Sequence, residues 1–184
     1  EEMKLGDDLT DEMRAIIHNP EEPLRGLIHG LPGTGKSRVI TWICRFFEEA
    51  LRWKNGDQFI CVAFQNRMAA AINGSTLHSA GDLPRPGEDR EKKLTHGDVE
   101  NLFIQNERLR WILVDEVSMI SGTLLGDFEH QVSSAARCTR YRTRRDKTRR
   151  IFGGYNMLFF GDWWQLPPIP DSAALFKPPL EKKS

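Results

Sequence analysis

The sequence predicts one α/β domain with a mainly parallel central sheet flanked by helices. Two observations favour this fold. Short apolar segments alternate with segments whose apolar residues recur at helical spacing, and a glycine-rich loop directly follows the first apolar segment. Parallel strands need a helix-sized connection between them, so strands and helices alternate along such chains. The 184 residues leave room for one domain of this kind.

The expected strands are short and mostly apolar, and they cover residues 25–29, 59–64, 111–115 and 157–162. Continuous apolar runs of this length are typical of strands whose two faces are both covered by helices. The last two strands each end in an aspartate, and parallel α/β sheets place ligands at the carboxyl ends of their strands. A candidate site is therefore expected at that edge of the sheet.

Helices are expected between these strands. The first should span about residues 35–51, where apolar residues recur every three or four positions: Val39, Ile40, Ile43, Phe46, Phe47 and Ala50. Further helices are expected at residues 67–72, over about ten residues after Asp98, and at residues 121–135. Residues 81–97 combine glycines and prolines with a charge cluster, which predicts a surface loop.

The composition excludes several classes of protein. Hydrophobic residues make up 39% of the chain, which is enough for a buried core. Cys44, Cys61 and Cys138 are widely spaced, so they indicate neither a disulfide framework nor a zinc site and favour a reducing compartment. The longest nearly apolar runs fall far short of the roughly 20 residues that a membrane span needs. The acidic N-terminal segment does not resemble a signal peptide.

Residues 30–37 read GLPGTGKS and match the P-loop pattern G-x-x-x-x-G-K-[ST] between an expected strand and an expected helix. Glycines allow the backbone to turn its N–H groups around phosphate oxygens, and the start of the helix adds partial positive charge. Lys36 supplies a point charge to the outer phosphates, and Ser37 offers a hydroxyl to Mg²⁺. The alternative is an ordinary glycine-rich turn. The candidate nucleotide contacts in this loop are Gly30, Gly33, Thr34, Gly35, Lys36 and Ser37.

Asp115 and Glu116 end the apolar segment that begins at Trp111. A carboxylate delivered by a buried strand can hold Mg²⁺ directly or through water, which is the role expected of Asp115. Glu116 points elsewhere and can orient and deprotonate an attacking water. The alternative is a solvated strand end, which is common when such a pair stands alone. The P-loop earlier in the chain favours the functional interpretation.

Residues 161–169 read GDWWQLPPI after the last expected strand, and G-D-x-x-Q-L-P-P is a more specific pattern than a P-loop. On these residues the chain resembles the first motor domain of a superfamily 1B DNA helicase. The group concerned is the petite-integration-frequency (Pif) and RecD-like group, which includes the helicase portions of Helitron transposons. Residues 76–79 (TLHS), 115–119 (DEVSM) and 152–154 (FGG) agree with the resemblance.

The resemblance implies ATP and Mg²⁺ as ligands. In that family the P-loop binds ATP, the Asp-Glu pair binds Mg²⁺ and activates water, and the motif glutamine contacts the γ-phosphate. These roles fall on Lys36, Ser37, Asp115, Glu116 and Gln165, of which Lys36, Glu116 and Gln165 are the expected catalytic residues. The amide of Gln165 can hydrogen-bond both a phosphate oxygen and the water. Its alternative role is a hydrogen bond that stabilises the loop.

The resemblance also implies contacts with single-stranded DNA on the face opposite the nucleotide. The family's usual Thr-Gly pair is replaced here by Gln65 and Asn66, followed by Arg67, which puts phosphate contacts from small residues and backbone in doubt. All three side chains can still donate to a phosphate. His78 is either a DNA contact or a packing residue, and both interpretations remain open.

Three other features bear on ligands. Trp163 and Trp164 occupy the variable positions of the last motif, where one can pack against strand ends and the other, with Trp164 as the candidate, can stack on a base. Residues 137–150 hold eight basic residues against Asp146, a run that can follow a nucleic-acid backbone but is more often a solvated loop. Met13 replaces the glutamine of the family's adenine-recognition segment, which predicts weak selectivity among bases.

The sequence is interpreted as a single RecA-like P-loop NTPase domain over residues 1–184, the nucleotide-binding half of an ATP-dependent DNA helicase motor. The resemblance implies that a second RecA-like domain of the same parent chain supplies arginines to the γ-phosphate, so this chain alone should hydrolyse ATP slowly and not unwind duplex. The alternatives are another P-loop ATPase or a decayed transposon helicase that binds nucleotide or DNA without turnover. An intracellular location is expected, the nucleus or mitochondrion in a eukaryote and otherwise the cytoplasm, with no membrane partner.

Overall fold

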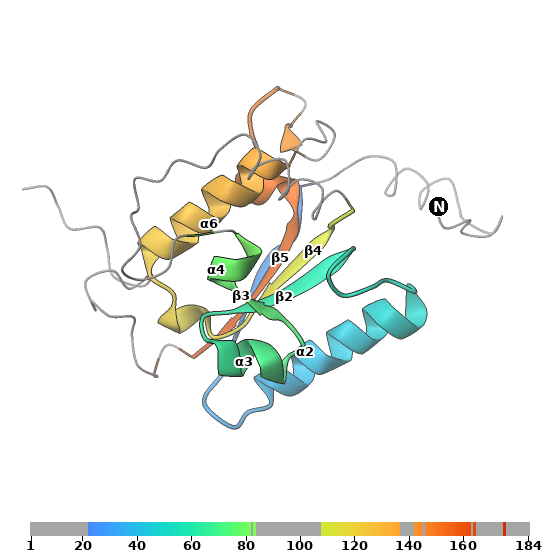
Figure 1. Ribbon diagram of the computed structural model, residues 1–184, viewed down its shortest axis with the longest axis vertical. Coiled ribbons are helices and arrows are strands. Elements are labelled where there is room, and N and C mark those ends of the chain that lie inside the picture. Colours follow the sequence, from blue (N-terminus) through green and yellow to red (C-terminus); the bar gives the residue numbers. More distant parts are fainter. Residues whose placement is uncertain are drawn as a thin grey trace, which may run out of the picture.

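A five-stranded sheet with helices on both faces forms the centre of the molecule (Figure 1). The computed structural model describes residues 22–81, 83, 108–136, 142–144, 146–162, 164 and 175. The strand order in the sheet is β1-β5-β4-β2-β3. The strands span Arg25–His29 (β1), Phe59–Ala63 (β2), Ser75–Thr76 (β3), Trp111–Val114 (β4) and Asn156–Gly161 (β5).

Every neighbouring pair of strands in this sheet is parallel. In register, Leu27 of β1 lies beside Phe159 of β5, and Val114 of β4 also lies beside Phe159. The carboxyl ends of all the strands therefore lie along one edge of the sheet. The predicted fold class is confirmed, and the four predicted strands match β1, β2, β4 and β5 to within one residue at each end. The short strand β3 was not among the predictions.

Helices cover both faces of the sheet. On one side lie α2 (Lys36–Arg45) and α3 (Asn66–Ala71), and on the other lie α4 (Leu77–Ala80) and α6 (Gly122–Ala135) (Figure 1). Successive strand residues point to opposite faces, so Cys61 packs towards α2 whereas Val62 packs towards α6. Because helices cover both faces of the sheet, its strands are continuous apolar runs and do not alternate between apolar and polar residues.

The helix predicted at residues 35–51 is present in two parts. After α2, the chain continues as a π-helical turn over Phe46–Ala50, in which the N–H of Leu51 donates to the carbonyl oxygen of Phe46. Phe47 lies in this turn and is 5% exposed. Its ring packs against those of Trp53, Phe59 and Trp111 at centroid distances of 5.2, 5.1 and 5.6 Å. This aromatic cluster fixes the far end of the helix that follows the P-loop.

Two of the predicted elements fall largely outside the described residues. These are the helix after Asp98 and the loop at residues 81–97, of which only Gly81 and Leu83 are described. The short helix predicted at residues 67–72 is present as α3, and the one predicted at 121–135 is present as α6. Among the described residues, the helices are all too short or too polar to cross a lipid bilayer.

Candidate functional site

The P-loop follows β1 and leads directly into α2. Gly33 and Gly35 have φ angles of 76° and 94°, a left-handed backbone that other residues adopt only with strain, and Gly35 caps the helix. A Cβ atom at Gly30 would lie 2.6 Å from Thr34 Oγ1, so this position needs glycine for space rather than for its backbone angles. The first turn of α2 consequently points its N–H groups towards the loop.

Lys36 lies at the first position of α2 and reaches back across the loop. Its Nζ donates to the carbonyl oxygens of Gly30 at 2.6 Å and Leu31 at 3.1 Å. Thr34 Oγ1 also donates to the Leu31 carbonyl oxygen, at 2.8 Å. The ammonium group is thus held inside the curve of the loop, where the helix N-terminus adds positive potential. Ser37 lies beside it at the exposed start of the same helix.

The carboxylates of Asp115 and Glu116 are positioned by the end of β4. The N–H of Asp115 donates to the Val62 carbonyl oxygen at 2.9 Å, which extends the ladder between β4 and β2 by one bond. Asp115 Oδ1 accepts from the N–H of Glu116 at 2.9 Å. Glu116 has a φ of 51°, a left-handed conformation that is uncommon for a residue other than glycine. The turn after β4 therefore begins at Glu116, directly beyond the hydrogen-bonded Asp115.

Burial raises the pKa of both carboxyl groups of this pair. Burial raises the pKa of Asp115, while the N–H of Glu116 and the positive charge of Lys36 oppose the rise. The pKa of Glu116 is also raised, first by burial and then by the negative charge of Asp115, and Lys36 again opposes the rise. Lys36 therefore lies close enough to both carboxylates to act on them electrostatically. The P-loop and the Asp115–Glu116 pair are two of the three motifs to which the sequence analysis assigns the nucleotide site, and the motif of Gln165 is the third.

Asp162, directly after β5, brings a third carboxylate to this edge. The residue is fully buried, and its Oδ1 accepts from the N–H of Trp164 at 3.0 Å. Its negative charge contributes to the raised pKa of Glu116, which places it near the other two acids. From the sequence, Asp162 is predicted only as the end of a strand, without a role in the site.

Several buried polar atoms at this edge have no hydrogen-bond partner among the described residues: Glu116 Oε2, Ser118 Oγ and Asp162 Oδ2. Buried polar atoms are rarely left unpaired, so each of these is suited to a ligand, an ion or an ordered water. No group of three or more His, Cys, Asp and Glu side chains in the described part of the chain is arranged to hold a metal ion alone. The donors present fit Mg²⁺ bound jointly by protein and phosphate oxygens, which is its usual mode.

The strand ends that carry these residues are tied together through backbone contacts. The N–H of Gly30 donates to the carbonyl oxygen of Gly161 at 3.3 Å, which joins the P-loop to the end of β5. A Cβ atom at Gly161 would lie 2.8 Å from Val117 Cγ1, so the turn after β4 packs directly on the end of β5. The P-loop and both acidic strand ends therefore form one continuous region. Gln165, the third catalytic candidate, lies outside the described residues.

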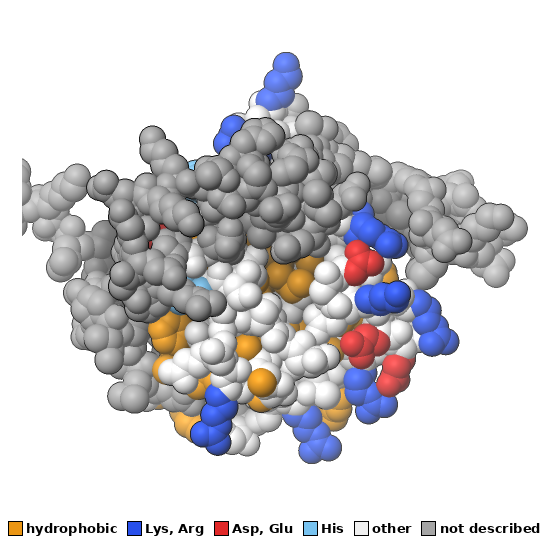
Figure 2. All heavy atoms as spheres, in the orientation of Figure 1, with side chains coloured by type: hydrophobic (Ala, Val, Ile, Leu, Met, Phe, Trp, Pro, Cys, Tyr) orange, Lys and Arg blue, Asp and Glu red, His pale blue; other side chains and the backbone are white. Residues whose placement is uncertain are grey.

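Four of the DNA candidates, Gln65, Asn66, Arg67 and His78, lie after β2 and β3 at the other half of the same sheet edge, whereas Trp164 lies after β5. Gln65, Asn66 and Arg67 form the start of α3 and are all exposed. The ring centroids of His78 and Phe64 lie 6.4 Å apart, so His78 makes at least one packing contact. Trp164 is 81% exposed. On the face shown in Figure 2, basic and acidic side chains are interspersed along the right-hand flank.

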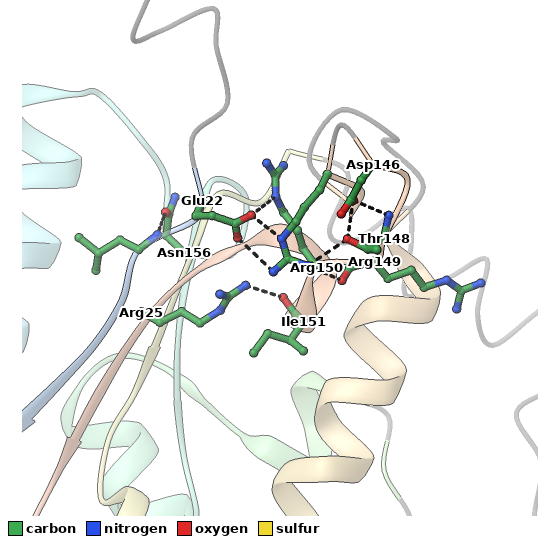
Figure 3. Close-up of polar contacts among 10 residues, drawn as sticks. Glu22, Arg25, Asp146, Thr148, Arg149, Arg150, Ile151 and Asn156 are labelled. Atoms are coloured by element: carbon green, nitrogen blue, oxygen red, sulfur yellow. Dashed lines mark hydrogen bonds and ion pairs between the residues drawn. The ribbon is translucent and has the colours of Figure 1, made fainter.

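Two arginines of the described part of the arginine-rich segment, Arg144 and Arg150, lie against the carboxylate of Glu22. Arg144 donates from Nε and Nη2 to the two carboxylate oxygens of Glu22, at 2.5 and 3.3 Å (Figure 3). Arg150 is 7% exposed and lies 3.7 Å from the same carboxylate. Arg25 at the start of β1 donates to the carbonyl oxygen of Ile151 at 3.2 Å. This cluster lies at the amino ends of the strands, away from the P-loop, and it favours the loop interpretation over a DNA contact here.

Comparisons with known proteins agree with this arrangement. A family model described as an AAA domain matches residues 13–171. The ATP-dependent DNA helicase PIF1 of Emericella nidulans is 32% identical over 144 residues, which are 77% of this chain and 18% of that protein. PIF1 of Saccharomyces cerevisiae is 29% identical over 172 residues, 88% of this chain and 17% of that protein.

Solved structures give the same result. The Bacteroides Pif1 helicase, crystallised with ADP-AlF3 and single-stranded DNA, superposes with a TM-score of 0.55 at 26% identity. The match covers 87% of this chain and 33% of that chain. The chain thus spans less than a fifth of the curated relatives named above and about a third of this solved structure.

Proposed function

We propose that this chain, which belongs to the AAA domain family, is the ATP-binding and ATP-hydrolysing motor domain of a DNA helicase. The observation that carries the proposal is the convergence of Lys36, Asp115 and Glu116 at one edge of a parallel sheet. The curated relatives that match most of this chain are named as DNA helicases. A P-loop enzyme of another kind has no comparable support.

The P-loop is proposed to hold the triphosphate of ATP. The N–H groups at the start of α2 and the ammonium group of Lys36 together supply positive potential to phosphate oxygens. Lys36 already donates to two carbonyl oxygens within the loop, and ionised phosphate is the stronger acceptor. The ammonium group can therefore exchange its loop carbonyls for β- and γ-phosphate oxygens. Gly30, Gly33, Thr34 and Gly35 contribute the shape of the cradle.

Ser37 and Asp115 are proposed to hold Mg²⁺ together with the phosphates. When bound, Mg²⁺ neutralises charge that develops on the phosphates during transfer. The hydroxyl of Ser37 lies at the exposed start of α2, and Asp115 is 5% exposed at the end of β4. The same positive charge would favour the ionised forms of the two carboxylates whose pKa values are raised by burial.

Glu116 is proposed to accept a proton from the attacking water. Its Oε2 is buried and has no hydrogen-bond partner among the described residues, as a base awaiting a water requires. A raised pKa also makes this carboxylate a better proton acceptor than an exposed one. Gln165 is proposed to contact the γ-phosphate through its amide, the role that the resemblance implies.

Single-stranded DNA is proposed to bind along the ends of β2 and β3 through Gln65, Asn66 and Arg67, with His78 as a further contact. Trp164, which follows β5, is proposed as a separate contact farther along the same sheet edge. The hydrogen bond from Asp115 to Val62 connects this region to the nucleotide site, because Val62 lies one strand away and just before the exposed start of α3. A movement of β4 on phosphate release would thus reach the DNA loop directly.

We also propose that the 184 residues form one RecA-like domain that works with a second RecA-like domain of its parent chain. Arginines from such a domain typically raise phosphoryl transfer rates by about 10³ or more. A nuclear or mitochondrial location in a eukaryotic cell is part of the same proposal.

An ATPase assay with and without single-stranded DNA tests the proposed function, with Lys36→Ala as the matched inactive variant. On the parent chain, we expect DNA to stimulate hydrolysis and Lys36→Ala to remove it. A decayed remnant would bind nucleotide without turnover in either condition. Unwinding by the isolated 184 residues at the rate of the parent would contradict the need for a second domain.

A further inference from the structure

Two cysteines that are distant in sequence meet between α2 and β2. Cys44 lies in the last turn of α2, and Cys61 lies in the middle of β2. Their Sγ atoms are 3.4 Å apart, and both are free thiols. Seventeen positions separate the two residues, so no local pattern in the sequence brings them together. Neither residue belongs to the nucleotide site described above.

The two thiols are not equivalent. Cys61 is 1% exposed and surrounded by core side chains, whereas Cys44 is only half-buried. The hydrogen bond with Cys61 lowers the pKa of the Cys44 thiol, although burial and the nearby Glu48 oppose this. The same hydrogen bond and burial raise the pKa of Cys61. One sulfur is thus partly accessible and more readily ionised, and the other is protonated and held beside it.

We propose that Cys44 and Cys61 form an oxidation-sensitive pair that closes to a disulfide when the protein meets a peroxide. The Cys44 thiolate attacks one oxygen of hydrogen peroxide, the O–O bond breaks, and Cys44 becomes a sulfenic acid with release of hydroxide. Cys61 sulfur then attacks the Cys44 sulfur, the S–O bond breaks, and the hydroxyl group of the sulfenic acid leaves with the Cys61 proton as water. The proton that Cys44 lost on ionising converts the released hydroxide to the other water. In sum, two thiols and one peroxide give one disulfide and two waters.

The position of this pair gives the bond a mechanical consequence. The helix α2 begins at Lys36, and β2 is hydrogen-bonded through Val62 to Asp115. A bond between Cys44 and Cys61 therefore fastens the helix of the P-loop to the strand beside the one that ends in the metal-binding acid. The disulfide would join α2 and β2 at positions outside the nucleotide site, so it would limit the relative movement of the helix and the strand without occupying that site.

Intact-mass measurement and peptide mapping of the oxidised protein test the proposal. Every protein carries Cys138→Ser, so that the only remaining thiols are the pair. After treatment with hydrogen peroxide, we expect a mass loss of about 2 Da, a cross-linked peptide containing both cysteines, and recovery of both thiols with dithiothreitol. A protein that keeps both thiols free, or gains oxygen at Cys44 without a cross-link, would overturn the proposal.

Trapping with dimedone, which reacts with sulfenic acids, tests whether Cys44 is the thiol that peroxide oxidises and Cys61 the thiol that resolves the sulfenic acid. In Cys61→Ala the sulfenic acid on Cys44 cannot be resolved, so we expect at least about tenfold more dimedone adduct than in the protein with both cysteines. In Cys44→Ala the buried Cys61 should remain unlabelled. Equal labelling with and without Cys61 would contradict its role as the resolving thiol. The mapping of the unsubstituted pair does not depend on whether either variant folds.

Discussion

The ammonium group of Lys36 donates to the carbonyl oxygen of Gly30 at 2.6 Å, across the loop that precedes its own helix. This bond shows that the lysine reaches over the curve of the P-loop rather than into solvent. Within the described residues, the hydrogen bonds of this ammonium group go to neutral carbonyl oxygens, which ionised phosphate oxygens exceed in strength by roughly a factor of two. The geometry therefore links the affinity for nucleotide directly to this side chain.

Lys36→Ala should weaken the binding of a non-hydrolysable Mg-ATP analogue by about 10- to 100-fold, the usual contribution of a charge-assisted hydrogen bond. Isothermal titration calorimetry measures this change. Lys54→Ala is the matched control, because Lys54 is an exposed lysine that lies outside the P-loop and α2. An unchanged affinity in Lys36→Ala, or an equal loss in both variants, would show that the loop does not grip the triphosphate.

Glu116→Gln should slow ATP hydrolysis by about 10² to 10⁴ while leaving nucleotide affinity nearly unchanged, because an amide cannot take the proton of the attacking water. Steady-state ATPase assays and equilibrium binding on the same preparations separate the two effects. Glu49→Gln removes an exposed carboxylate that pairs with Arg45 and serves as the control. A parallel loss of binding and turnover would instead assign Glu116 to nucleotide binding.

Asp115→Asn should stabilise the folded protein at pH 8, by roughly the 0.5–2 kcal/mol that single stabilising substitutions provide. The pKa of Asp115 is raised by burial, so folding favours the neutral carboxyl. Its contribution to stability is fully present below the unfolded pKa of about 4 and is lost as pH rises through the folded pKa. Denaturant unfolding at pH 8 and near pH 4 measures the difference.

The gain from Asp115→Asn should shrink at the lower pH, because both side chains are then neutral. Asp127→Asn, which changes an exposed carboxylate on α6, is the control for the general effect of removing a negative charge. A variant less stable than the original protein at pH 8 would mean that Asp115 is held by favourable contacts that outweigh its burial.

Arg67→Ala should lower the affinity for single-stranded DNA by about 3- to 10-fold and reduce the slope of log affinity against log salt by about 0.7, as the loss of one phosphate contact does. Arg144→Ala should leave both quantities unchanged, because Arg144 is paired with Glu22 at the opposite edge of the sheet. Fluorescence anisotropy with a labelled oligonucleotide at several salt concentrations measures both. The reverse ranking would move the DNA surface to the arginine-rich segment.

Gly153→Ala should destabilise the fold by about 1–3 kcal/mol, since its φ is positive and a Cβ atom there would lie 2.6 Å from that of Ala136. Gly126→Ala lies inside α6, where a Cβ meets no atom within 4 Å, and should stabilise by about 0.5–1 kcal/mol. Urea unfolding of the two variants gives both numbers. The same sign for both would contradict the close packing of residues 151–154 on α6.

The sequence alone predicted four of the five strands of the sheet and the position of the P-loop before α2, but not the short strand β3. Continuous apolar runs marked β2, β4 and β5 because both faces of each are buried, and the glycine pattern marked the loop before α2 because few residues adopt its backbone angles. The adjacency of Lys36 and Asp115 followed from parallel topology, which gathers strand ends at one edge.

Features that depend on packing between distant segments were not predictable. The contact between Cys44 and Cys61 requires α2 to lie across β2, and the burial of Arg150 requires Glu22 from a segment more than a hundred residues earlier. The turn after β4 approaches Gly161 closely, which likewise joins segments that are distant in the sequence. Charge and spacing in the sequence carry no signal for any of these.

The account depends most on one nucleotide and one metal ion sharing the P-loop and Asp115. Calorimetric titration of a non-hydrolysable ATP analogue, in Mg²⁺ and in EDTA, tests this directly in the original protein and in Asp115→Asn. We predict that Mg²⁺ strengthens binding by about tenfold or more in the original protein, a coupling of the size usual between linked sites, and that Asp115→Asn removes most of this gain. The same gain in both proteins would contradict the account, because Asp115 would then lie apart from the bound metal.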